Sequence, residues 1–126
     1  MNNIKIGVIG SNSFSGASFV DFALANNLSV MGISRSEQPN DIFLPYSSNT
    51  HKEERFKFHQ LDLNNNLEEM IDLIKKEKPD YIFNFAAQSM VAEGWKFPEQ
   101  WFTTNAVSMN CFFINLFLIF GLNLYE

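Results

Sequence analysis

Apolar and polar residues alternate along the chain in blocks that predict strands separated by helices. Short β-branched and aromatic runs that end near turn-forming or polar residues predict strands at Ile4–Ile9, Leu28–Ile33, Phe56–Leu61 and Tyr81–Phe85. Helical spacing of apolar residues predicts helices at Ser15–Asn26, at Asn64–Lys76 and from Pro98 to as far as Phe120. The 22 residues of Ser34–Arg55 are polar, contain two prolines and are predicted to be irregular. A loop of that length is typically either functional or mobile.

The alternation of strands and helices predicts an α/β fold with a doubly wound parallel sheet. Parallel neighbours need crossover connections, and such connections are right-handed in nearly all proteins. We therefore expect one domain over residues 1–126, with the strand order 3-2-1-4 and helices on both faces, as three α/β/α layers.

The last helix is unusually apolar. No charged residue occurs from Gln100 to Tyr125, whereas a surface helix of an α/β domain normally keeps a polar face. Three interpretations stay open: a helix buried against a partner or a missing domain, a truncated or frame-shifted tail, and a membrane span. Asn110 and Asn115 interrupt the run and no basic flank follows, so the membrane is the least favoured of the three.

Composition excludes several classes of function. The chain has 9 Lys and Arg against 14 Asp and Glu, a formal net charge of -5, which gives no general attraction to nucleic acid. A single cysteine, Cys111, rules out a disulfide-stapled scaffold, and His51 and His59 have no cysteine partner for zinc, so no metal site is expected. The first residues show no targeting signal, which favours a cytoplasmic protein.

A glycine-containing turn follows the first predicted strand. Residues Gly10 to Gly16 read G-x-x-S-x-x-G and open the first helix, with Ser13 in the middle. Glycines in such a turn allow close approach of a pyrophosphate, and the helix N-terminus offers free N–H groups to the anion. The alternative is a plain strand-to-helix turn in which glycine serves packing alone.

Polar residues after the second and third strands bear on the choice of cofactor. A dinucleotide fold that selects NAD places an acid after the second strand, but this chain has Ser34, Arg35 and Ser36. An arginine flanked by hydroxyls suits the 2′-phosphate of NADP, although a solvated loop arginine, partly neutralised by Glu37, is the alternative. Asp62, after the third strand, could accept a hydrogen bond from adenine, act as a helix N-cap, or do both.

At these residues the chain resembles the N-terminal part of an extended short-chain dehydrogenase/reductase of the NAD(P)-dependent epimerase/dehydratase family. Within that family it is most similar to the GDP-mannose 4,6-dehydratase type. The resemblance covers residues 4 to about 107 and rests on the turn Gly10–Gly16, on Gly32–Ser36, on Asp62 and Leu63, on Pro79–Ser89, and on Pro98 and Asn105. The run Pro79–Ser89 is its most specific part.

The resemblance implies a Rossmann-type domain that binds NADP, with NAD less favoured. The cofactor-binding residues that it implies are Gly10, Ser13, Phe14, Ser15, Gly16, Ser34, Arg35, Ser36, Asp62, Leu63, Phe85, Ala86, Ala87 and Asn105. Gln88 and Ser89 would lie near a nucleotide-sugar substrate. It also implies a 4,6-dehydratase or epimerase that recycles the hydride of its cofactor, acting as a homo-oligomer.

Two departures from the family pattern bear on these expectations. Ser13 replaces the usual middle glycine, and we expect its Cβ to cost on the order of 1 kcal/mol and some closeness to the pyrophosphate. The catalytic Tyr-x-x-x-Lys pair is absent: Thr50 and Phe85 stand four residues after Tyr46 and Tyr81. We therefore expect an N-terminal fragment, truncated after the fourth strand and its helix and inactive alone. The alternative is a non-catalytic NADP-binding or scaffold domain that associates through its apolar helix.

Overall fold

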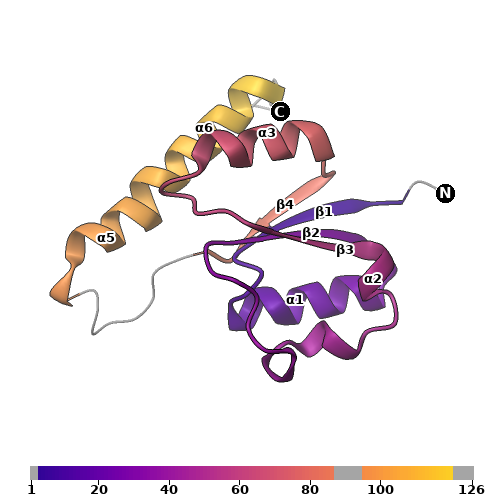
Figure 1. Ribbon diagram of the computed structural model, residues 1–126. Helices are drawn as coiled ribbons and strands as arrows, with labels where there is room; N and C mark the ends of the chain where they lie inside the picture. The colour runs from indigo at the N-terminus through magenta and orange to yellow at the C-terminus, as the bar shows by residue number, and fades with distance from the viewer. Residues whose placement is uncertain (1–2, 87–94, 121–126) are drawn as a thin grey trace. The chain divides into compact units, whose positions relative to one another are not determined.

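The computed structural model describes residues 3–86 and 95–120 (Figure 1). Its elements are β1 (Lys5–Ile9), α1 (Phe14–Ala25), β2 (Ser29–Ser34), the 3₁₀ turns η1 (Asp41–Phe43) and η2 (Pro45–Ser48), α2 (Lys52–Arg55), β3 (Phe56–Gln60), α3 (Leu67–Glu77), β4 (Tyr81–Asn84), α5 (Pro98–Phe102), the π-helical turn η3 (Thr103–Ser108) and α6 (Met109–Phe120). They form two compact units, residues 1–61 with 77–86 and residues 62–76 with 87–126.

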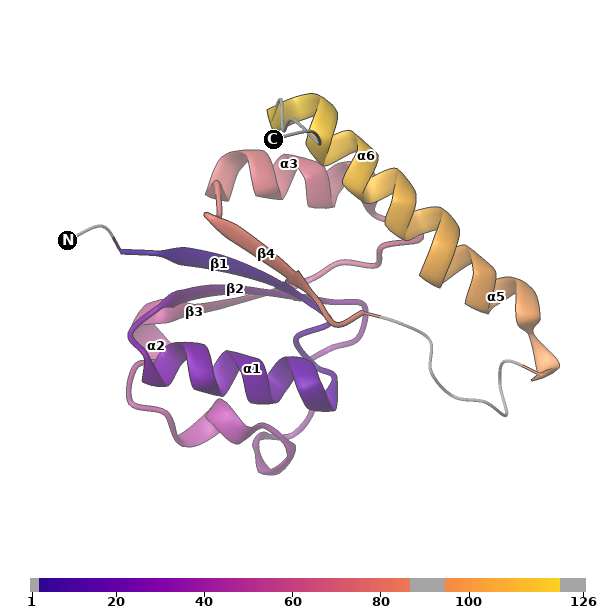
Figure 2. The same cartoon turned by 180° about the vertical axis from the view of Figure 1, so that it is seen from behind.

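The first unit is built on a four-stranded parallel sheet in the order β3-β2-β1-β4, as predicted. Each strand begins and ends within one residue of its predicted bounds. Helix α1 covers one face of this sheet in both views (Figures 1 and 2). The α/β, Rossmann-type class is therefore confirmed, while the three-layer arrangement depends on the placement of the second unit and stays a prediction.

Helix α1 is defined by a cap at each end. At its start, the Ser13 hydroxyl accepts a hydrogen bond from the Gly16 N–H at 3.0 Å. At its end, Asn27 takes a positive φ of 60°, and the N–H groups of Asn27 and Leu28 return to the carbonyls of Leu24 and Ala23. This is the Schellman arrangement, which releases the chain into β2.

The segment between β2 and β3 is more ordered than the sequence predicted. It contains η1, η2 and α2 instead of irregular chain, and it buries Leu44 and Tyr46 in the core cluster of the first unit. The Tyr46 ring lies 4.8 Å from that of Phe56, and its hydroxyl accepts a hydrogen bond from Gln38 at 2.9 Å. Burial raises the pKa of this hydroxyl above its usual 10.0, an effect that the Gln38 hydrogen bond partly offsets. The segment is thus anchored to the sheet domain by two apolar side chains.

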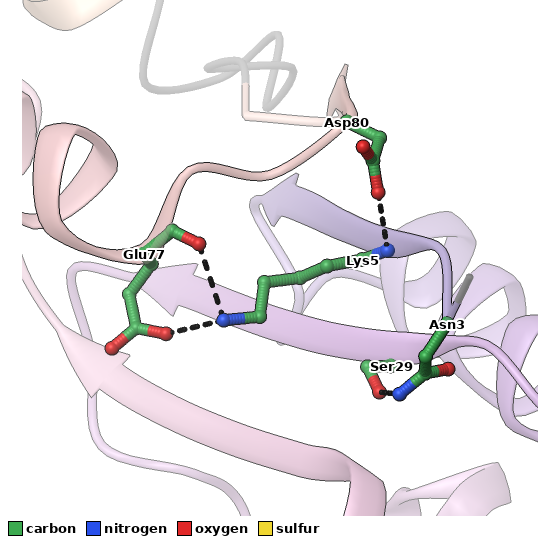
Figure 3. A network of polar contacts seen from close by, with 5 residues as sticks. All are labelled: Asn3, Lys5, Ser29, Glu77 and Asp80. Atoms are coloured by element: carbon green, nitrogen blue, oxygen red, sulfur yellow. Dashed lines mark hydrogen bonds and ion pairs between the residues drawn. The ribbon is translucent and has the colours of Figure 1, made fainter.

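A polar network joins the amino ends of the strands (Figure 3). The Lys5 ammonium donates to the carboxylate of Glu77 at 2.7 Å and to its backbone carbonyl at 3.2 Å. The Lys5 N–H donates to the Asp80 carboxylate at 2.8 Å, and the Asp80 N–H donates to the Lys5 carbonyl at 2.7 Å. Asn3 adds a bond to the Ser29 hydroxyl. These contacts fix where β4 begins beside β1 and hence where its carboxyl end emerges.

The second unit contains α3, α5, η3 and α6. Helix α3 begins at Leu67, three residues later than predicted, because Asp62–Asn66 form a separate hydrogen-bonded turn. The predicted helix from Pro98 to Phe120 is interrupted by the π-helical turn η3. Within this unit α6 runs alongside α3 in both views (Figures 1 and 2).

The apolar C-terminal helix is buried on one side and exposed on another. Buried side chains recur at Met109, Phe112 and Leu116 of α6, and exposed apolar side chains occur at Ile114 and Leu118 of α6 and at Val107 in the preceding turn η3. Among residues 3–86 and 95–120, no helix combines the length and the hydropathy that crossing a membrane requires.

Candidate cofactor-binding site

The carboxyl ends of three strands meet at one edge of the sheet. Ile9, near the end of β1, lies opposite Ile33 in β2 and Asn84 in β4. The segments that leave these strands therefore start side by side. In open α/β sheets, ligands bind at this edge, at the point where the strand order reverses. Here the order reverses beside β1, which has β2 on one side and β4 on the other.

Gly10 brings the turn after β1 against the end of β4. Its φ of +81° lies in the left-handed region, and its N–H donates to the Ile33 carbonyl at 2.7 Å. A Cβ at this position would lie 2.6 Å from the Ala86 nitrogen and 2.7 Å from the Phe85 carbonyl carbon. Only glycine allows so close an approach without a shift of the backbone. The structure thus brings together Gly10, Phe85 and Ala86, three of the residues that the resemblance implies for cofactor binding.

Gly16 closes the same turn from the helix side. A Cβ here would lie 2.1 Å from the Gly10 carbonyl oxygen. The first turn of α1 therefore sits directly on the turn that leaves β1. The two glycines perform the packing that a dinucleotide turn requires.

Ser13, whose Cβ we expected to be costly in the middle of the turn, has no strained backbone. Its φ of -68° and ψ of 160° are ordinary extended values. Its hydroxyl donates to the Gly10 carbonyl at 2.7 Å while it accepts from the Gly16 N–H. The conformation at this position therefore does not require glycine, and the serine contributes a helix cap.

The start of α1 offers an anion site. Phe14 and Ser15 are exposed, and in residues 3–86 their N–H groups have no hydrogen-bond acceptor. Unpaired N–H groups at a helix N-terminus, together with the positive end of the helix dipole, favour a phosphate. The geometry of the turn therefore fits a pyrophosphate.

Arg35 lies at the same edge, directly after β2. Its side chain is exposed, and no ion pair with Glu37 or another acid occurs in the described part of the chain. Ser34 is buried, and its hydroxyl accepts a hydrogen bond from the Asn12 N–H at 3.0 Å. Ser36 is exposed and contacts the Asn12 side chain. The guanidinium is thus available to a ligand.

Asp62, Leu63 and Asn105 belong to the second unit, so their distance from the glycine turn stays a prediction. The Asp62 carboxylate accepts hydrogen bonds from the Asn64 N–H at 2.9 Å and from the Asn65 side chain at 2.7 Å. Leu63 is buried. Asp62 stabilises the turn before α3 and is not its N-cap, because Asn66 directly precedes the helix.

Asn105 lies in the π-helical turn η3 and is exposed. The same turn is held by Asn64, whose amide donates to the Thr104 hydroxyl at 3.0 Å and accepts from the Ser108 hydroxyl. π-Helical turns are frequent at functional sites. Ala87, Gln88 and Ser89 lie outside the described residues.

Two residues of the turn escaped prediction. Ser11 is fully buried, and its hydroxyl has no hydrogen-bond partner among the described residues. Asn12 donates through its side-chain amide to the carbonyls of Ser36 and Glu37. The signal in the sequence is the polar character of both residues in a turn that must pack closely, but the acceptors of the Asn12 side chain are more than twenty residues away.

The opposite edge of the sheet carries a shallow depression of about 540 Å³, bordered by Lys5, Glu77 and Asp80 among others. These three residues already bond to one another. Among residues 3–86 and 95–120, no three His, Cys, Asp or Glu side chains are placed to hold a metal ion. The carboxyl edge is therefore the better candidate for a ligand site.

The family model described as GDP-mannose 4,6 dehydratase matches residues 8–113. A search of curated proteins gave no match.

Solved structures of sugar-nucleotide epimerases share the fold. The UDP-Glc/GlcNAc 4-epimerase from Campylobacter jejuni is 23% identical with a TM-score of 0.77, over 96% of this chain and 35% of that one. The UDP-glucose 4-epimerase from Thermotoga maritima with UDP-glucose is 22% identical with a TM-score of 0.70, over 86% and 32%. The one from Stenotrophomonas maltophila, with bound NAD and formylated UDP-arabinopyranose, is 18% identical with a TM-score of 0.74, over 88% and 32%. The chain thus spans about a third of the length of these enzymes.

Proposed function

The chain belongs to the GDP-mannose 4,6-dehydratase family, and from this premise we propose that it is the N-terminal, cofactor-binding part of a nucleotide-sugar 4,6-dehydratase or epimerase. The observation that carries the proposal is the turn at Gly10, which packs against Ala86 while the N–H groups of Phe14 and Ser15 have no acceptor among the described residues. A nicotinamide cofactor supplies hydride acceptance and return in such enzymes. This chain's own residues bind and orient it: the turn holds the pyrophosphate, and Phe85 and Ala86 line the nicotinamide side.

The proposal assigns the sugar chemistry to residues outside this chain. The chain has no Tyr-x-x-x-Lys pair to move protons at the sugar. We therefore expect the 126-residue chain to be inactive alone, and the intact protein to take a nucleotide sugar in the cytoplasm. Gln88 and Ser89 are the residues expected nearest that substrate.

NADP is the cofactor that we propose, on the basis of Arg35. Arginine to alanine at this position should weaken NADP binding by about 1.5–3 kcal/mol, because a charge-assisted bond to the 2′-phosphate is lost. NAD binding should change little, since NAD lacks that phosphate. Calorimetric titration of both cofactors into the intact protein and its Arg35→Ala variant measures this.

The matched control is Arg55→Ala, which removes an arginine at the amino-edge side of β3, where it bonds to Asn3 and the Asn27 carbonyl. It should leave the ratio of NADP to NAD affinity unchanged. Equal binding of NAD and NADP by the unaltered protein would overturn the NADP proposal and leave a dinucleotide site that prefers neither.

The exposed face of α6 supports association of two copies. Ile114 and Leu118, one helical turn apart in α6, are 57% and 77% exposed, and Val107 in the preceding turn η3 is 58% exposed. Exposed apolar stripes of this kind mark interaction surfaces. A non-catalytic scaffold that associates through this helix is the second candidate function, and a catalytic homo-oligomer would use the same face.

Replacing Ile114 and Leu118 together by glutamate should weaken this association by at least about 100-fold, because each buried aliphatic side chain contributes about 1.5–3 kcal/mol. Sedimentation velocity of the purified chain over a concentration series measures the change. Asn110→Glu places one glutamate at an exposed polar position of α6 and should leave association intact. An unaltered chain that sediments as a monomer at every concentration contradicts the proposed interface.

A further inference from the structure

Asn12 ties the glycine turn to the segment that carries Arg35. Its side-chain Nδ2 donates to the Ser36 carbonyl at 3.0 Å, to the Ser36 hydroxyl at 3.3 Å and to the Glu37 carbonyl at 2.9 Å. Its backbone N–H donates to the Ser34 hydroxyl at 3.0 Å. Asn12 therefore contacts the chain on both sides of Arg35, through the Ser34 hydroxyl before it and through the main chain of Ser36 and Glu37 after it.

We infer that the side chain of Asn12 is a positioning group that sets the selectivity of this site between NADP and NAD by fixing the main chain of Ser36 and Glu37, directly after Arg35. The inference rests on the proposed function, because it assigns Arg35 to the 2′-phosphate. Asn12 itself does not contact that phosphate; it acts through Arg35.

The position of Arg35 depends on its main chain, because its own side chain is exposed and unpaired in residues 3–86. Its carbonyl accepts a hydrogen bond from the Gln60 side chain at 3.2 Å. Asn12 holds the next two residues, and Ser34 before it is buried. A long side chain on a fixed main chain loses less entropy on binding than one on a mobile loop, so these restraints favour the ligand that Arg35 recognises.

Only the nitrogen of the Asn12 side-chain amide makes hydrogen bonds among the described residues. All of its side-chain bonds are made by Nδ2, while its Oδ1 is buried and has no partner among the described residues. A buried acceptor without a partner is unfavourable, which offsets part of the stability that the donated bonds supply. Alanine at this position therefore removes the donated bonds and no other polar contact of the side chain. It is a clean subtraction of the restraint.

The test measures affinities of the intact protein for NADP and NAD in four forms: unaltered, Asn12→Ala, Arg35→Ala and the double variant. Asn12→Ala should weaken NADP about tenfold, which corresponds to about 1.4 kcal/mol, and should leave NAD nearly unchanged. In the Arg35→Ala background it should no longer alter the ratio of the two affinities, because the group that it positions is gone. The control is Asn26→Ala, which removes an asparagine amide that donates to the Phe22 carbonyl at the other end of α1.

Trypsin provides a second measurement that needs no cofactor, since it cleaves after Arg35. Cleavage between Arg35 and Ser36 should be faster in Asn12→Ala than in Asn26→Ala when both are compared under folding conditions. Unaltered cleavage at this bond overturns the restraint. Equal losses for NADP and NAD, or the same change of ratio with and without Arg35, overturn the role in selectivity. Absence of binding of either cofactor by the unaltered protein refutes the proposed function and this inference with it, whereas a normal preference for NADP in Asn12→Ala refutes the inference alone.

Discussion

Gly10→Ala should lower the free energy of unfolding by about 2–5 kcal/mol, the sum of left-handed backbone strain and overpacking. The φ of +81° is unfavourable for any residue with a Cβ, and that Cβ would lie 2.6 Å from the backbone nitrogen of Ala86. Backbone atoms cannot turn aside as a flexible side chain can, so the turn and the end of β4 must separate. Urea denaturation of the chain, followed by circular dichroism, measures the loss.

Gly7→Ala is the matched control for this change. A Cβ at Gly7 would meet the ends of Met31 and Ile82 at 3.4 and 3.5 Å, which is ordinary contact. This variant should shift the free energy of unfolding by about 1 kcal/mol or less. Equal stability of the two variants would mean that the turn at Gly10 does not approach β4 as described, and the candidate site would lose its geometric basis.

The sheet could be predicted from the sequence because each strand is a short run bounded by strong turn signals. Gly10 ends the first run, and Asn26 and Asn27 separate the first helix from the second strand. The parallel order then follows from the alternation with helices, and it was confirmed. The segment 34–55 resisted prediction, since no periodic pattern marks it and its order comes from two side chains, Leu44 and Tyr46, buried by distant parts of the chain.

The candidate site was predictable where it rests on local geometry. The spacing of the glycines predicted a tight turn between strand and helix, and the positive φ of Gly10 and the close packing of Gly16 are the geometry of such a turn. At Ser13 the φ is that of a helix cap and not of the left-handed region, so the backbone does not require glycine there, while the expected loss of closeness to the pyrophosphate stays a prediction. The role of Asn12 could not be read locally, since its acceptors lie 24 and 25 residues away.

For the apolar C-terminal stretch, composition alone left three alternatives open. The absence of charge from Gln100 to Tyr125 left burial, an altered tail and a membrane span as alternatives. The helix buries Phe112 and Leu116 and exposes Ile114 and Leu118. Burial therefore accounts for one side of the helix, and the other side carries the proposed association. The π-helical turn before it has no counterpart in the hydrophobic pattern, because the apolar spacing runs through it without a break.

Tyr46→Ala should lower the free energy of unfolding by about 3–5 kcal/mol, the range for truncation of a large buried aromatic side chain. Tyr46 is fully buried, packs on Phe56 and belongs to the core cluster that includes Val8 and Val20. The variant also leaves the Gln38 amide without its partner. Thermal and urea unfolding measure the loss.

Phe43→Ala removes an aromatic ring three residues earlier in the same segment, where the side chain is 74% exposed. It should change the free energy of unfolding by about 0.5 kcal/mol or less. A large loss for Tyr46→Ala with none for Phe43→Ala means that the segment between β2 and β3 is part of the folded core. The main chain that carries Arg35 is then held at both ends, by β2 before it and by the buried Tyr46 after it. If both variants are as stable as the unaltered chain, the segment is a loop after all, and Asn12 and Gln60 are left as the restraints on Arg35.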